Sequence, residues 1–172
     1  MCHGLAMTAL TVRTLDPDDW RLCRAVRIAA LTDAPEAFGS TLSHEESLSE
    51  ERWRLRLAGR SQFLAEEDGA PCGLVGVVPV GPRAADLISM WVRPASRGTG
   101  AADLLVRAAL GWADEHGFAE VRLRVIEGNG AAERLYARHG FRREAASGSA
   151  EAPGADGEFT MVRVRPAADR VR

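Results

Sequence analysis

The feature that most constrains the fold is a change of hydrophobic period in the second half of the chain. Residues 84–92 form an apolar run that Pro94 follows closely, which predicts a β-strand. Residues 98–116 then place apolar side chains at helical spacing, and Gly117 ends that helix. Residues 119–126 return to strict alternation and predict another strand. This strand–helix–strand order predicts a mixed α/β domain with a crossover connection.

The remaining segments extend this domain on both sides. Further strands are expected at residues 10–15, 62–67, 73–80, 141–144 and 157–165, and further helices at 17–33, 50–58 and 131–139. Asp16 is the expected N-cap of the first helix, and residues 35–48 are expected to be irregular. Residues 146–157 are small, polar and glycine-rich, which predicts a mobile loop. We therefore expect one α/β domain over residues 9–166, flanked by a ragged start at 1–8 and a short tail at 167–172.

The composition is that of an ordinary globular protein. Hydrophobic residues make up 46% and charged residues 27%, and the formal net charge is −2. This balance favours neither nucleic acid nor an anionic membrane as a partner. Cys2, Cys23 and Cys72 are odd in number and far apart, so neither a disulfide framework nor a zinc site is expected. Without a signal-peptide pattern or a long apolar run, we expect a cytoplasmic location and no metal.

A turn of small residues joins the strand at 84–92 to the helix that follows. Residues 92–102 read Val-Arg-Pro-Ala-Ser-Arg-Gly-Thr-Gly-Ala-Ala. Glycines let a ligand approach the backbone, and the free N–H groups and dipole of a helix start attract phosphate. A dinucleotide fingerprint would need a third glycine near Asp103, and the other common phosphate loop needs a lysine, which this chain lacks. A helix start without any ligand is the alternative interpretation.

A second segment, residues 129–141, also follows a strand directly. It reads Asn-Gly-Ala-Ala-Glu-Arg-Leu-Tyr-Ala-Arg-His-Gly-Phe, with Asn129 at the expected N-cap. Tyr136 is the only tyrosine of the chain and lies on the same helix face as Ala132. Its ring either packs in the core with the hydroxyl at the edge or serves a reaction.

The two segments together resemble the GNAT superfamily of acyl-CoA-dependent N-acetyltransferases. The family's Gln/Arg-x-x-Gly-x-Gly/Ala signature is similar to residues 97–102, and its Asn-x-x-Ala-x-x-Leu-Tyr-x-x-x-Gly-Phe signature is similar to residues 129–141. The resemblance is strongest over residues 90–141. It implies a mixed sheet with helices on both faces and splayed central strands.

The resemblance also implies acetyl-CoA as co-substrate and a set of residues that bind it. The pyrophosphate would be held by Arg97, Gly98, Thr99, Gly100, Ala101 and Ala102. Backbone groups of Met90 and Val92 would hold the pantetheine arm and the thioester carbonyl, and Trp91 between them is also expected to bind the cofactor. Asn129 would contact the pantetheine side, with small Ala132 leaving room and Tyr136 near the sulfur. Residues 93–143 carry nine arginines against six acidic residues, which suits an anionic ligand.

The implied reaction is attack of a neutral primary amine on the acetyl thioester in a ternary complex. Backbone N–H groups would stabilise the oxyanion, and Tyr136 would protonate the leaving thiolate as general acid. The expected catalytic residues are Tyr136 and, as general base, Asp86. Other base candidates are Glu127 and either Glu66 or Glu67.

The acceptor is expected to be a small-molecule or peptide amine. His44, Glu45 and Glu46 lie in the region that covers the acceptor site in this family, where a carboxylate would hold a cationic amine. His116 and His139 lie near helix ends, where capping and the helix dipole explain them, and His3 is expected to be disordered. A homodimer fits the family, and the competing hypothesis is an acyl-CoA-binding sensor or partner module without turnover.

Overall fold

The computed structural model describes residues 8–144 and 157–166 of the 172-residue chain. The strands are β1 (Leu10–Leu15), β2 (Ser61–Glu67), β3 (Ala70–Pro79), β4 (Ala84–Val92), β5 (Glu120–Ile126), β6 (Arg142–Arg143) and β7 (Glu158–Val164). The α-helices are α1 (Trp20–Asp33), α2 (Leu42–Ser47), α3 (Glu50–Ala58), α4 (Ala101–Glu115) and α5 (Gly130–Arg138). Short 3-10 turns are η1 (Pro17–Asp19), η2 (Pro35–Ala37) and η3 (Pro94–Ser96). The predicted mobile loop at 146–157 lies outside the described residues except for Gly157. The predicted start at 1–8 does so except for Thr8, and the predicted tail at 167–172 lies wholly outside them.

The strands form a seven-stranded sheet in the order β1-β2-β3-β4-β5-β7-β6. β4 pairs in parallel with β5, while β1–β2, β5–β7 and β6–β7 pair antiparallel, so the sheet is mixed. The predicted mixed α/β class and the crossover through α4 are confirmed. β5 pairs with β7 along its whole length, from Glu120 to Ile126, but the ladder to β4 joins only Ala84–Asp86 to Glu120–Arg122.

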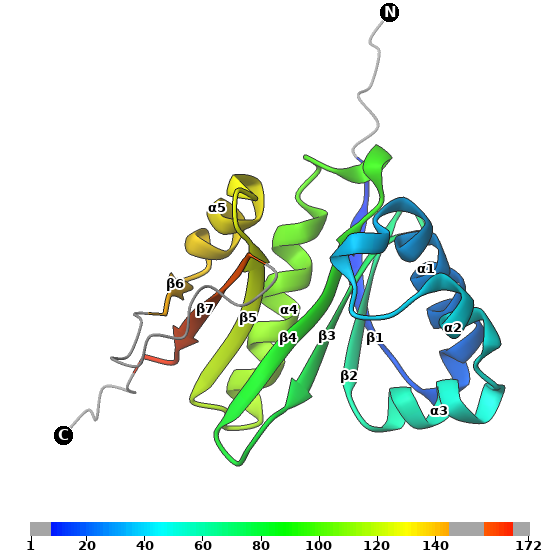
Figure 1. Ribbon diagram of the computed structural model, residues 1–172, viewed down its shortest axis with the longest axis horizontal. Helices are drawn as coiled ribbons and strands as arrows, with labels where there is room; N and C mark the ends of the chain where they lie inside the picture. Colours follow the sequence, from blue (N-terminus) through cyan, green and yellow to red (C-terminus); the bar gives the residue numbers. More distant parts are fainter. Residues whose placement is uncertain (1–7, 145–156, 167–172) are drawn as a thin grey trace, which may run out of the picture. The chain divides into compact units, whose positions relative to one another are not determined.

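The chain divides into two compact units. The first comprises Met1–Gly76 and Ser89–Ala108, and the second comprises Val77–Ile88 and Ala109–Arg172. Three elements, β3, β4 and α4, therefore each contribute residues to both units. Figure 1 identifies the elements along the chain.

In the first unit, three helices gather beside β1 and β2 (Figure 1). α1 contacts both α2 and α3. The core of this unit comprises Leu15, Cys23, Val26, Ala30, Trp53, Leu57, Leu64, Leu74 and Trp91. Asp16 caps the first turn as predicted, in a capping box with Asp19, but that turn is η1 and α1 starts only at Trp20.

The expectation that residues 35–48 are irregular is wrong in part. They contain η2 and the six-residue helix α2. Thr41 caps α2, because its side chain accepts a hydrogen bond from the His44 N–H. The segment has no long apolar stripe, so helical periodicity could not reveal so short a helix.

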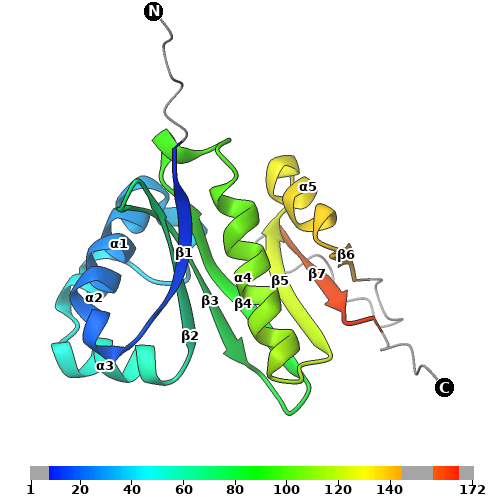
Figure 2. The same cartoon turned by 180° about the vertical axis from the view of Figure 1, so that it is seen from behind.

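In the second unit, β5 alternates buried and exposed residues as predicted. Val121, Leu123 and Val125 are buried, and the arginines between them are exposed. Figure 2 shows α5 beside β5 and β7, with β6 next to β7. Phe141 lies three residues after the end of α5 and is 2% exposed, and its N–H donates to the carbonyl of Tyr136.

None of the helices found among the described residues is long and apolar enough to cross a membrane.

Candidate active site

The glycine-rich turn lies in the first unit, between the end of β4 and the start of α4. Gly98 and Gly100 have positive φ angles of 80° and 94°, a conformation that favours glycine. A Cβ atom added at either residue would meet nothing within 4 Å, so the space beside this backbone is open. The N–H of Leu104 donates to the carbonyl of Gly100, so the amides of Ala101 and Ala102, at the start of α4, precede the first hydrogen bond of the helix. An open surface with outward amides at a helix start suits a phosphate group.

Asp33, at the end of α1, holds this turn in place. One of its carboxylate oxygens accepts hydrogen bonds from Trp91 Nε1 at 3.0 Å and from Arg97 Nη2 at 2.7 Å. Arg97 Nε also donates to the carbonyl of Val92 at 3.0 Å. The hydrogen bond from Trp91, helped by Arg97, holds the pKa of Asp33 below its usual value. The Arg97 side chain thus fastens the turn to α1 and β4.

Ser96 supplies a second attachment, to β2. Its hydroxyl forms a short hydrogen bond with Glu67, which also accepts from Arg93 Nη2 at 3.0 Å. These contacts, first the one with Ser96, hold the pKa of Glu67 below its usual value. The carbonyl of Ser96 accepts a hydrogen bond from the Thr99 hydroxyl at 2.5 Å. The Thr99 side chain therefore braces the turn.

The end of β4 carries two unusual backbone features. Ser89 has a φ of 56°, which is rare for a residue with a side chain, and its hydroxyl accepts a hydrogen bond from Arg27 Nη1 at 2.6 Å. On the neighbouring strand β3, a Cβ added at Gly73 would lie 2.7 Å from the carbonyl oxygen of Trp91. Only glycine allows that approach, and Trp91 itself is 8% exposed and part of the core. Because the Trp91 side chain is buried in the core, only the backbone of Trp91 is available for the predicted cofactor binding.

The second unit carries the other predicted residues of the site. Asn129 caps α5 as predicted, because its Oδ1 accepts from the Ala132 N–H at 3.1 Å. Tyr136 is 7% exposed and packs edge-on against Phe141, with ring centroids 5.7 Å apart. Burial raises the pKa of Tyr136 to about 12. At any ordinary pH the phenol is therefore protonated and can donate a proton, but it cannot serve as a base.

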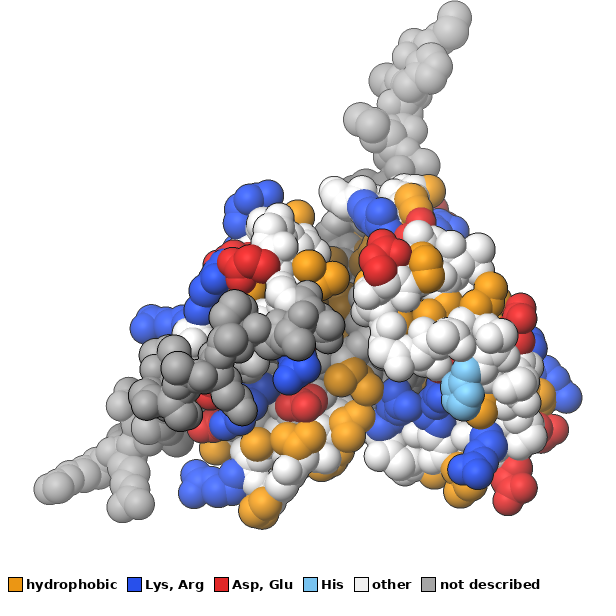
Figure 3. Space-filling model, viewed as in Figure 1, with side chains coloured by type: hydrophobic (Ala, Val, Ile, Leu, Met, Phe, Trp, Pro, Cys, Tyr) orange, Lys and Arg blue, Asp and Glu red, His pale blue; other side chains and the backbone are white. Residues whose placement is uncertain are grey.

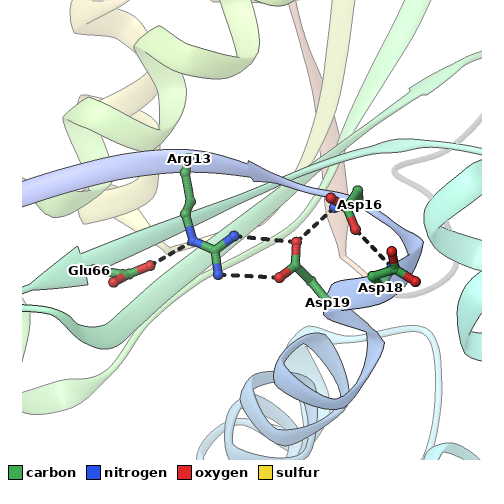
Figure 4. A network of polar contacts seen from close by, with 5 residues as sticks. All are labelled: Arg13, Asp16, Asp18, Asp19 and Glu66. Atoms are coloured by element: carbon green, nitrogen blue, oxygen red, sulfur yellow. Dashed lines mark hydrogen bonds and ion pairs between the residues drawn. The ribbon is translucent and has the colours of Figure 1, made fainter.

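The structure separates the four base candidates by their partners. Glu66 pairs with Arg13 Nε at 2.9 Å, in a network that Asp19 completes (Figure 4). Glu127 pairs with Arg143 Nη1 at 3.0 Å.

Glu67 is also paired, through Arg93 and Ser96. Asp86 differs from all three, since no basic side chain of the described residues lies within 4 Å of its carboxylate. It is half-buried on β4, opposite Arg122 of β5. Arg122 donates instead to Glu120, at 2.9 Å.

The hypothesis that a carboxylate at residues 44–46 holds a cationic amine is wrong for Glu45. This residue is fully buried on α2, and Arg56 Nη1 donates to its Oε2 at 2.6 Å. His44 and Glu46 are exposed on the same short helix. The two other described histidines lie at helix ends as predicted: His116 Nδ1 lies 2.8 Å from the Trp112 carbonyl oxygen, and His139 is the C-cap of α5.

The predicted residues thus fall into two sets. Met90 to Ala102 lie together in the first unit, and Asp86, Asn129, Ala132 and Tyr136 lie in the second. The sequence did not reveal Asp33, which looks like a helix-ending residue before Pro35. The left-handed Ser89 was also missed, because serine inside an apolar strand gives no signal for positive φ.

The comparisons with known proteins agree with this geometry. Residues 27–141 match the family described as Acetyltransferase (GNAT) family. The chain therefore belongs to the GNAT acetyltransferases. A curated relative, mycothiol acetyltransferase of Renibacterium salmoninarum, is 30% identical over 141 residues, which cover 79% of this chain and 41% of that protein. This chain spans about two fifths of the length of that relative.

Solved structures show the same fold. An acetyltransferase of the GNAT family from Streptococcus pneumoniae superposes with a TM-score of 0.73 at 22% identity, covering 91% of this chain and 100% of that one. The PaiA N-acetyltransferase of Thermoplasma acidophilum, solved in complex with coenzyme A, gives a TM-score of 0.67 at 18% identity, covering 91% and 99% of the two chains.

Proposed function

We propose that this protein transfers an acetyl group from acetyl-CoA to a primary amine. The observation that carries the proposal is the open turn at Gly98 and Gly100, where two left-handed glycines precede the start of α4. Family membership and the coenzyme A bound to the PaiA relative support the same ligand. When bound, acetyl-CoA supplies an acetyl thioester, which is the activated acyl group of the reaction.

The residues of the turn fit a pyrophosphate. The backbone of Gly98 to Ala102 offers N–H donors, while the side chains of Arg97 and Thr99 are occupied in bracing the turn. We propose that the backbone of this segment, rather than the Arg97 guanidinium, makes the main phosphate contacts. Backbone groups of Met90 and Val92 are proposed to align the acyl group and to stabilise the oxyanion.

Tyr136 is proposed as the general acid. The amine nitrogen forms a bond to the acyl carbon, the carbon–sulfur bond breaks, and the Tyr136 hydroxyl gives its proton to the thiolate. The attacking nitrogen releases its remaining extra proton to solvent, and the phenolate takes up a proton from solvent, so the protons balance. A phenol whose pKa is about 12 stays protonated until the thiolate develops.

Asp86 is proposed as the general base. The incoming ammonium must lose one proton before attack, and Asp86 is the one carboxylate of the four candidates with no basic side chain within 4 Å among the described residues. A carboxylate already paired with arginine is a weaker proton acceptor, because the positive partner favours its charged form.

The test is acetyl-CoA binding with matched glycine variants. We expect saturating acetyl-CoA to raise the melting temperature of the wild type, because a ligand at 100 times its Kd adds about 2.7 kcal/mol to the free energy of unfolding. Gly100→Val should lose most of this shift. Gly117→Val is the control, because Gly117 also has positive φ and open space but lies beyond α4, away from the turn.

A thiol-release assay with a panel of amines then separates an enzyme from a binding module. Thiol release that depends on an added amine supports the transferase. Binding of acetyl-CoA without release for any amine would favour the acyl-CoA-binding module, and absence of binding would contradict both functions.

A further inference from the structure

The first unit contains a half-buried group of arginines with too few carboxylates. We define the arginine cluster as Arg27 of α1, Arg56 of α3 and Arg60, which follows α3. Glu45 is the carboxylate that pairs with it: Arg56 Nη1 lies 2.6 Å from Glu45 Oε2, and Arg27 Nη2 lies 3.6 Å from Glu45 Oε1. Three cations thus share one anion.

The cluster is removed from water to an unusual degree for arginine. The side chains of Arg27 and Arg56 are 11% and 20% exposed. Among the described residues, Arg60 has no carboxylate within 4 Å. Burial and the nearby charges of Arg56 and Arg27 lower the pKa of Arg60 to about 10. Such cations are costly unless an anion accompanies them.

One buried nitrogen of the cluster and one oxygen of Glu45 form no hydrogen bond within the described part of the chain. Arg27 Nε is buried and forms no hydrogen bond in the described structure, and neither does Glu45 Oε1. The guanidinium groups are held in place by aromatic rings, since Arg27 lies 4.6 Å from the Phe38 ring centroid and Arg56 lies 4.6 Å from that of Trp53. The donors are therefore preorganised. Figure 3 shows cationic side chains reaching the surface between α2 and α3.

The cluster lies beside the strand proposed to hold the acyl group. Arg27 Nη1 donates to the Ser89 hydroxyl at 2.6 Å, and Ser89 directly precedes Met90 in β4. An anion bound by the cluster is thus connected to the acyl-binding strand through one side chain. We propose that the arginine cluster binds a carboxylate of the acceptor, so that the acceptor is an amine of amino-acid size that carries a carboxylate.

This inference rests on the proposed acetyl transfer and reverses the charge expected from residues 44–46. The planar fork of guanidinium donors matches a carboxylate well, and charge-assisted hydrogen bonds of this kind are strong. A cationic polyamine without a carboxylate would instead be repelled by the excess positive charge.

The activity test uses amines that differ only in the carboxylate. We expect free amino acids to be acetylated with kcat/KM about 10- to 100-fold above that of their primary amides and decarboxylated amines. Arg60→Met should remove most of this preference by lowering the rate with the acid. Arg52→Met, an exposed arginine on α3, is the control and should keep the preference.

A binding test works without turnover. N-acetylated amino acids should stabilise the wild type and Arg52→Met in a melting assay, while their amides should not, and Arg60→Met and Arg27→Gln should lose the stabilisation. Equal kcat/KM for acids and amides, or a carboxylate preference that survives in both cluster variants, would overturn the inference while leaving acetyl transfer intact. If acetyl-CoA does not bind at all, the proposed function fails, whereas carboxylate binding that depends on Arg60 would still support the cluster as an anion site.

Discussion

The two units differ in whether a largely buried arginine has a carboxylate partner. In the second unit, the side chain of Arg163 is 16% exposed and forms a bidentate ion pair with Asp114, with N–O distances of 2.8 and 3.0 Å. In the first unit, Arg60 is half-buried near two other arginines and has no carboxylate within 4 Å among the described residues. The first arrangement is complete without a ligand, while the second leaves charge uncompensated.

This difference separates groups that support the fold from groups available to ligands. The paired carboxylates Glu66, Glu67 and Asp114 each have an arginine partner. Asp86 and Arg60 have no such partner among the described residues. Side chains that lack partners in the protein itself are therefore the ones we expect to act on substrates.

The largest expected effect comes from removing the negative charge that pairs with the arginine cluster. Glu45→Gln removes the charge that compensates three half-buried cations, so it should lower the free energy of unfolding by about 3 kcal/mol. Thermal or urea unfolding measures this. Glu46→Gln, the exposed neighbour, should stay within about 0.5 kcal/mol of the wild type.

A double variant sharpens this result. Adding Arg60→Met to Glu45→Gln should restore part of the lost stability, because one excess cation is removed. If the changes in the free energy of unfolding of the two single variants simply add, Arg60 is not electrostatically coupled to Glu45. The contrast drawn between Arg60 and Arg163 would then be wrong.

The second prediction compares the two arginines directly. Arg163→Met should destabilise the protein by about 1–2 kcal/mol, since Asp114 is left without its partner but remains one-third exposed. Arg60→Met should cost less than about 0.5 kcal/mol or raise stability. Comparable losses for both variants would make Arg60 a structural residue.

The pH dependence provides a separate measurement of the Arg163 pair. Hydrogen bonding to Arg163 holds the pKa of Asp114 below its ordinary value of 3.8 in the folded state. The contribution of this pair is therefore present above that value and is lost as the pH falls through the folded-state pKa. The stability of Arg163→Met should decline less steeply in this acidic range than that of the wild type.

The third prediction concerns Tyr136. Tyr136→Phe keeps the ring but removes the acidic hydroxyl, so kcat should fall at least about 10-fold while the Kd for acetyl-CoA stays within about 2-fold. Because the pKa of Tyr136 is raised to about 12, the deficit should be constant up to about pH 10. An unchanged kcat, with single-turnover kinetics showing that product release is not limiting, would reduce Tyr136 to a packing residue.

The smallest effect is expected for the base. Asp86→Asn should lower kcat/KM several-fold at neutral pH, and the deficit should shrink at high pH as free amine becomes abundant. Glu66→Gln and Glu127→Gln, whose carboxylates are paired with arginines, should follow the wild-type pH–rate profile. Superimposable profiles for all three variants would point to a water chain in place of a single carboxylate.

Local patterns in the sequence were sufficient to predict most elements of the fold. The bounds of β4 agree with the predicted range 84–92, and the predicted caps at Asp16 and Asn129 are both present. The left-handed glycines of the phosphate-type turn were also foreseeable, because glycine spacing before a helix is a local property. The starts of α1 and α4 lie a few residues later than predicted, since tight turns precede both helices.

Only the tertiary structure decided which charges are paired. Asp33 and Arg97 lie 64 residues apart in the sequence but 2.7 Å apart in space, and Arg13 reaches Glu66 across 53 residues. In the sequence, Glu45, Glu66 and Glu67 look like free carboxylates similar to Asp86. Folding pairs the first three with arginines and leaves Asp86 without one, while Arg60 is brought beside like charges. The sequence by itself therefore determined the elements and the phosphate turn, because these depend on neighbours along the chain. The partners of each charge depend on long-range packing, and that packing decided which side chains remain available for chemistry.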